Sequence, residues 1–60
     1  MKSSELHRLI RKNGWIDIRQ EGSHIIYEKK GYEATSVPFH GSKEAGKGIE
    51  LKFKKAMGLK

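Results

Sequence analysis

Cysteine is absent from this 60-residue sequence, and so is any long hydrophobic run. Without cysteine there is no disulfide framework, thiolate zinc site or cysteine nucleophile. No apolar stretch approaches the roughly 18 residues that span a membrane, and the N-terminus lacks a secretion signal, so we expect a cytoplasmic protein without membrane contact. A chain this short buries only about 60% of its unfolded surface. We therefore expect one domain, residues 1–60, with room for a single site.

Acidic residues are few: 7 Asp and Glu stand against 13 Lys and Arg, for a formal net charge of +6. Residues 1–14 hold four bases and one acid, residues 15–38 three bases and four acids, and residues 39–60 six bases and two acids. The positive charge therefore lies at both ends of the chain. Such a distribution suits a polyanionic partner, although it would also serve solubility alone.

The first segment has the pattern of an amphipathic helix from about Ser4 to Asn13. Its apolar residues recur at helical spacing: Leu6, Leu9 and Ile10. Ser3 suits the N-cap, while Gly14 suits the left-handed position after the last turn and lets Trp15 pack back on the helix. His7 has no evident partner nearby in the sequence, so we expect it on the surface.

After this helix the apolar spacing changes to alternation, which predicts three strands joined by tight turns. We expect Ile16 and Ile18 on one face of the first strand and Asp17 and Arg19 on the other. The strands expected are Trp15–Arg19, His24–Glu28 and Tyr32–Val37, the last stopped by Pro38. Consecutive strands with short connections form an antiparallel meander.

A polar loop, Phe39–Lys47, should lead to a second helix from about Gly48 to Met57, with Leu51 off its apolar stripe. The order is then helix, strand, strand, strand, helix. Because both helices must bury an apolar face, we predict an α+β domain in which two helices cover one face of a three-stranded antiparallel sheet.

Two motifs suggest cofactor sites that the sequence does not support. The stretch 41–48 fits the phosphate-binding pattern G-x-x-x-x-G-K, but Gly48 stands where a hydroxyl must bind magnesium, so we expect no nucleotide cofactor. Lys43 and Lys47 lie in a basic loop before a helix start, where free backbone N–H groups can help them hold a phosphate. The alternative is a flexible basic loop without a ligand. His24 and His40, without a suitably spaced carboxylate, make a weak metal site, and we expect none.

The stretch Arg19-Gln20-Glu21-Gly22-Ser23-His24 places an imidazole directly after a tight turn. At a sheet margin in a positive field, His24 could act as a general acid or base near neutral pH. Taken from these residues alone, a surface histidine without a chemical role remains an open alternative. Glu28, two residues along the same strand face, could orient the ring.

The sequence as a whole resembles the HicA, or YcfA-like, family of small bacterial toxins. The elements that carry the resemblance are Ser3 to Leu9, Gly14-Trp15, Arg19 with Gly22-Ser23-His24, Val37-Pro38 with His40, Lys43-Glu44, Gly46-Lys47-Gly48 and Gly58-Leu59. The chain departs from the family at Ile25, where many members carry a second histidine, and at Ile49-Glu50, where Thr-Leu is commoner.

The resemblance implies a fold like that of double-stranded-RNA-binding domains and the activity of a messenger-RNA endonuclease, held inactive by a HicB-type antitoxin. It also implies that His24 is catalytic. Such cleavage needs no metal, because RNA supplies its own 2′-hydroxyl nucleophile, and we expect Arg19, Ser23, Lys43 and Lys47 to bind the RNA. Alternatives are a non-catalytic RNA-binding module of the same fold and a basic surface that serves chiefly an acidic antitoxin.

Overall fold

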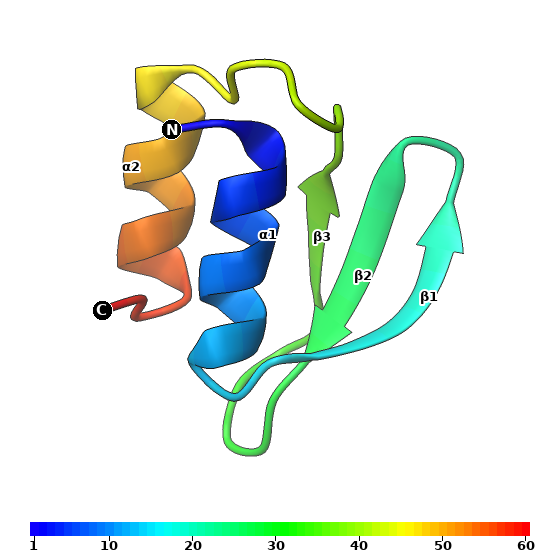
Figure 1. Ribbon diagram of the computed structural model, residues 1–60. Coiled ribbons are helices and arrows are strands. Elements are labelled where there is room, and N and C mark those ends of the chain that lie inside the picture. Colours follow the sequence, from blue (N-terminus) through cyan, green and yellow to red (C-terminus); the bar gives the residue numbers. More distant parts are fainter.

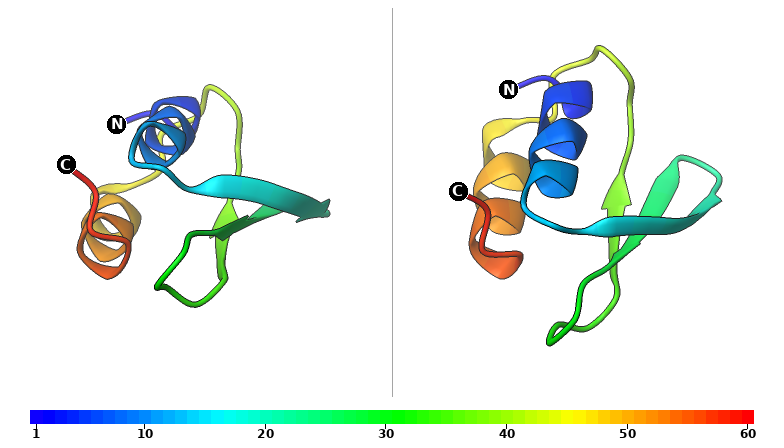
Figure 2. Two further views of the ribbon diagram at one scale, coloured as in Figure 1. Left: turned by 90° about the horizontal axis from the view of Figure 1, so that it is seen from below. Right: turned by 60° about the horizontal axis from the view of Figure 1, so that its bottom comes forward.

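The computed structural model describes residues 1–60 as two helices and one sheet. In chain order the elements are α1 (Ser3–Lys12), β1 (Ile16–Glu21), β2 (His24–Glu28), β3 (Thr35–Pro38) and α2 (Lys47–Ala56). The strands are antiparallel in the order β1-β2-β3, and both helices lie on one side of the sheet (Figures 1 and 2). The predicted α+β order is confirmed. Neither helix has the length and apolar character needed to cross a membrane.

The core lies between the helices and the inner face of the sheet. Its seven buried residues are Leu6, Ile10, Trp15, Tyr27, Val37, Phe53 and Met57. Every residue of β1 is exposed, so this edge strand is held through its pairing with β2 rather than by burial. Leu51, which lies off the apolar stripe of α2, is exposed as its position suggests.

The C-terminal end of α1 follows the prediction. Gly14 has a φ of 95°, in the left-handed region, and the Trp15 N–H donates to Ile10 O at 3.4 Å. The Trp15 side chain is buried, and its indole N–H donates to Met57 O at 3.2 Å. Trp15 therefore joins both helices in the core.

The N-terminal end of α1 differs from the prediction, because Ser3 is the first helical residue and Lys2 is the N-cap. The Glu5 carboxylate accepts the Lys2 N–H at 2.8 Å. Ser3 is buried, and its hydroxyl accepts the N–H of His40 at 3.0 Å. The chain between β3 and α2 thus closes over the start of α1, and Ser3 is used to hold that segment instead of capping its own helix.

A β-bulge changes the facing of β1. Asp17 pairs with Tyr27 and Arg19 with Ile26, which leaves Ile18 as the extra residue. Because directly paired residues point to the same side, Arg19 joins Ile16 on the outer face of the sheet. Ile16 and Asp17 lie on opposite faces as predicted, but the prediction that Arg19 lies on the face of Asp17 is wrong, because strict alternation stops at the bulge.

The third strand begins three residues later than predicted, at Thr35. Tyr32 instead lies in the turn region and packs its ring on Trp15, with 5.2 Å between ring centroids. Helix α2 begins at Lys47, one residue before the predicted Gly48. These shifts leave the predicted meander unchanged.

Candidate active site

The connection between β1 and β2 is a two-residue turn, Gly22-Ser23, closed by the pair Glu21 and His24. Gly22 has a φ of 60°, and a Cβ added there would meet no atom within 4 Å. Glycine is therefore needed for its backbone conformation and not for space, as at the first central position of a type II′ hairpin. This turn sets His24 as the first residue of β2.

His24 is exposed, on the outer face of the sheet with Ile26 and Glu28. Its backbone is fixed from both sides, because it pairs with Glu21 of β1 and Pro38 of β3. Its ring takes part in none of the side-chain hydrogen bonds within the chain. A free imidazole on a fixed backbone can both accept and donate a proton to a molecule lying on this face.

Arg19 points to the same face as His24, as its pairing with Ile26 requires. Its Nε lies 3.2 Å from Oε2 of Glu21, and both side chains are more than 60% exposed. An ion pair this exposed contributes little stability and exchanges readily for another anion. Arg19, Ser23 and His24 thus come from one hairpin, as predicted.

Lys43 and Lys47 lie further from the hairpin. Lys43 is in the segment that closes over α1, where its backbone O accepts the N–H of Ser3 at 2.8 Å. Lys47 begins α2, which lies beside α1 on the same side of the sheet (Figure 2). Neither ammonium group hydrogen-bonds to the hairpin. The structure therefore places both lysines at the same end of the molecule as the turn but not around the imidazole.

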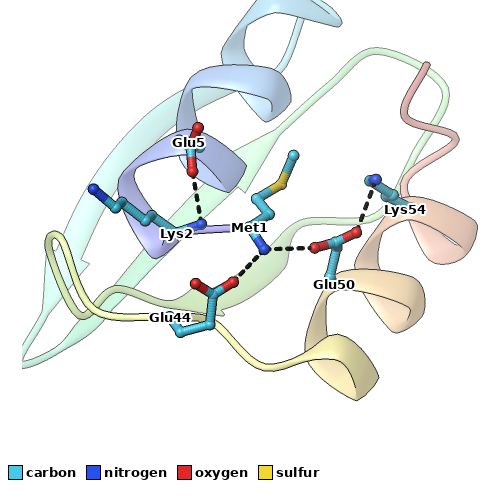
Figure 3. A network of polar contacts seen from close by, with 6 residues as sticks. All are labelled: Met1, Lys2, Glu5, Glu44, Glu50 and Lys54. Carbon is cyan, nitrogen blue, oxygen red and sulfur yellow. Dashed lines mark hydrogen bonds and ion pairs between the residues drawn. The ribbon is translucent and has the colours of Figure 1, made fainter.

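Two carboxylates lie beside the start of α2, so its charge is not purely positive (Figure 3). The Met1 ammonium contacts Glu44 and lies 3.1 Å from Glu50, which also pairs with Lys54 at 3.0 Å. The hydrogen bond to Glu44 raises the pKa of the Met1 ammonium, and the bond from Lys54 lowers the pKa of Glu50. Both carboxylates are thus matched by cations, and Lys47 keeps its charge free for a ligand.

No group of three or more His, Cys, Asp and Glu side chains lies close enough together to hold a metal ion. The one surface depression, of about 720 Å³, is lined by residues around the end of β2, including Glu28, Lys30 and Tyr32. It therefore lies at the opposite end of that strand from His24.

Residues 3–59 match the protein family described as HicA toxin of bacterial toxin-antitoxin. The chain belongs to the HicA toxin family. The match includes the β1–β2 hairpin, the segment between β3 and α2, and both helices. A search of curated proteins found no match. Membership implies a toxin that acts within a toxin–antitoxin system.

One polar residue of this HicA-family chain lies where the sequence analysis does not place it. His7 was expected on the surface but is fully buried, with Nδ1 2.6 Å from the Tyr27 hydroxyl and Nε2 2.8 Å from Pro38 O. These partners lie 20 and 31 residues away in the sequence, which is why local reasoning did not find them. A signal existed, because Ser3, Leu6, His7 and Ile10 follow the i, i+3, i+4, i+7 spacing of one helical face.

A neutral His7 ring in one tautomer makes both of its hydrogen bonds. A carbonyl oxygen can only accept, so Nε2–H donates to Pro38 O and Nδ1 accepts the Tyr27 O–H. The Tyr27 oxygen in turn accepts from Nη1 of Arg11 at 3.2 Å. Burial lowers the pKa of His7 and raises the pKa of Tyr27. Every polar atom of this network is satisfied while His7 carries no charge.

Proposed function

We propose that this HicA-family protein is a metal-independent endoribonuclease that cleaves messenger RNA, with His24 as general acid/base, and that a HicB-type antitoxin restrains it. The observation that carries the proposal is the state of His24: an exposed imidazole with no internal partner, on a backbone fixed by strands on both sides. Family membership, which implies a toxin, supports the same conclusion.

The chemistry begins with the 2′-hydroxyl of the RNA. His24 removes its proton as the 2′-oxygen attacks the adjacent phosphorus, and a cation stabilises the additional negative charge of the crowded phosphate. The 5′-oxygen of the next nucleotide then leaves and takes a proton, so the products end in a 2′,3′-cyclic phosphate and a 5′-hydroxyl. With one histidine serving both proton transfers, we expect slow turnover.

Four residues are proposed to bind the RNA. Arg19 is the candidate cation for the reacting phosphate, because it shares the outer face with His24 and its ion pair with Glu21 exchanges at low cost. Ser23 presents a hydroxyl in the turn itself. Lys43 and Lys47, at the helical side of the same end, would contact phosphates further along the strand and supply affinity that weakens with salt.

The test is cleavage of an RNA in EDTA, compared with the same RNA carrying 2′-O-methyl groups throughout. We expect the first to be cut to fragments with 2′,3′-cyclic phosphate ends and the second to remain intact. Cleavage of the methylated RNA, or loss of activity in EDTA, would contradict the mechanism. Protein that shifts RNA in a gel without cutting it would instead favour a non-catalytic RNA-binding module.

The partner has a separate test. A HicB-type antitoxin added at a 1:1 ratio should stop cleavage, because the toxin must be silenced while its partner is present. An acidic partner would also associate rapidly with a chain of net charge +6. Complex formation that leaves cleavage unchanged would contradict this part of the proposal.

A further inference from the structure

The end of β3 is held from inside the core by His7. Its Nε2–H donates to Pro38 O at 2.8 Å, and the Phe39 ring meets the imidazole edge-on, with 5.0 Å between centroids. The ring itself is fixed by Tyr27, whose hydroxyl lies 2.6 Å from Nδ1. Both ring nitrogens are therefore engaged, and the imidazole has a single orientation that meets all its partners.

The same two residues also hold the candidate active-site turn. Pro38 pairs with His24 across β2 and β3, and the Phe39 N–H donates to Ser23 O at 2.6 Å. Each residue thus contacts His7 on its inner side and the turn on its outer side. A displacement of Pro38 and Phe39 would be transmitted directly to Ser23 and His24.

Ser3, one helical turn before His7, holds the next part of the same segment. Its hydroxyl accepts the His40 N–H at 3.0 Å, and its own N–H donates to Lys43 O at 2.8 Å. Apart from the Tyr27 hydroxyl and the Trp15 indole, Ser3 and His7 are the buried polar side chains of the chain. Burying such groups costs free energy unless they are hydrogen-bonded. Each has a hydrogen-bond partner in the segment 38–43.

We propose that His7, assisted by Ser3, is a positioning residue for the active-site hairpin: from α1 it fixes Pro38 and Phe39, which in turn fix Ser23 and His24. This role rests on the proposed function of His24 as the catalytic residue. His7 itself touches no substrate, because it is fully buried behind β3.

Two amide substitutions separate the contacts of His7. A glutamine amide nitrogen reaches the position of Nε2 and can keep the bond to Pro38 O, whereas an asparagine amide nitrogen reaches only the position of Nδ1. In His7→Asn we expect amide exchange at Phe39 to be accelerated more than at Met57, whose N–H donates to Phe53 O in α2. His7→Gln should keep the protection of Phe39 close to that of the parent protein.

Cleavage kinetics should follow the same division. A displaced general base typically costs about 10-fold to 100-fold in rate, so His7→Asn should lower kcat by that factor with KM near the parent value, and His7→Gln should restore kcat. Phe53→Leu, a core change in α2, is the matched control. If Phe53→Leu destabilises the protein as much as His7→Asn does, it should still leave kcat unchanged. It should also leave the exchange rate of Phe39 relative to Met57 unchanged.

Several outcomes would overturn the positioning role. One is a folded His7→Asn protein in which the exchange rate of Phe39 and kcat equal those of the parent protein. Another is a Phe53→Leu protein that, at the same stability as His7→Asn, loses as much kcat. If His7→Asn does not fold, Ser3→Ala takes its place, and unchanged exchange at His40 and unchanged kcat would then overturn the role. Amide exchange needs no RNA, so it tests the positioning even if the parent protein cleaves none and the proposed function fails.

Discussion

His7 and His24 carry the same side chain, but His7 is buried in the core and His24 is exposed on the sheet. The ring of His7 has no solvent exposure and contacts Tyr27, Pro38 and Phe39. The ring of His24 is exposed and takes part in none of the chain's side-chain hydrogen bonds. A buried polar group must find its hydrogen-bond partners inside the protein, whereas an exposed one remains available to a ligand. His7 therefore stabilises the fold, and His24 is free to contact a substrate.

The largest difference between the buried and the exposed histidines is expected in folding stability. Replacing His7 by leucine keeps a side chain of similar bulk but removes the donor to Pro38 O and the acceptor for Tyr27. We expect the free energy of unfolding to fall by about 2–3 kcal/mol, the cost of leaving buried polar groups unpaired. Urea unfolding measures this change. The exposed His40 is the control, and His40→Leu should change stability by less than about 0.5 kcal/mol. Equal losses in the two variants would contradict the distinction.

A smaller loss is expected when only the far side of the His7 network is removed. Tyr27→Phe deletes the hydroxyl that donates to Nδ1 and accepts from Arg11. Because Arg11 is exposed and can turn to water, only Nδ1 is left unpaired, and we expect a loss of about 1–2 kcal/mol. Unfolding of Tyr32→Phe, whose hydroxyl is not part of this network, provides the comparison. A larger loss for Tyr32→Phe would overturn the assignment.

Titration of His7 should also make the folding stability depend on pH. Its pKa lies below the usual 6.5, chiefly because of burial, with Arg11 adding to the lowering and the Pro38 bond opposing it. Below pH 6.5 the unfolded chain therefore binds the proton more readily than the folded chain does. The contribution of His7 to stability is complete above that pH and declines as the pH falls.

His7→Gln removes the titrating group and should remove this decline. Urea unfolding of parent and variant between about pH 7.5 and pH 5.5 measures the difference, in a range above the titration of most carboxylates. The parent should lose more stability than the variant over this range. Parallel curves would contradict the buried neutral histidine.

The smallest effect is expected from the lysines beyond the hairpin. Lys43→Ala or Lys47→Ala should weaken binding of single-stranded RNA and reduce the slope of log K against log salt by about 0.7 each, because each removes one phosphate contact. Lys30, exposed at the other end of the sheet, is the control and should leave the slope unchanged. Titrations with an uncleavable 2′-O-methyl RNA measure these slopes. A larger change for Lys30→Ala would place the RNA elsewhere.

Much of the fold follows from local patterns in the sequence. The stop at Gly14, the strand at 24–28 and the meander depend on neighbouring residues, and each is present in the structure. The errors depend on contacts between distant residues. Ser3 accepts the N–H of His40 instead of capping its own helix, and the partners of the buried His7 lie 20 and 31 residues away.

The candidate site divides in the same way. Arg19, Ser23 and His24 come together because a six-residue stretch with a tight turn must do so. The face that Arg19 shares with His24, however, depends on the bulge at Ile18, which no local sequence pattern predicts. The position of Lys43 and Lys47 depends on how the segment after β3 crosses α1, which is fixed by backbone bonds from Ser3 and Ser4.

The most direct test of the account is to measure RNA cleavage and unfolding on the same His24→Ala protein in EDTA. Loss of a general acid/base should lower the cleavage rate by about 10²-fold to 10⁴-fold. Because the ring is exposed, the free energy of unfolding should stay within about 0.5 kcal/mol of the parent value. A stable His24→Ala protein that cuts RNA at the parental rate would contradict the central claim.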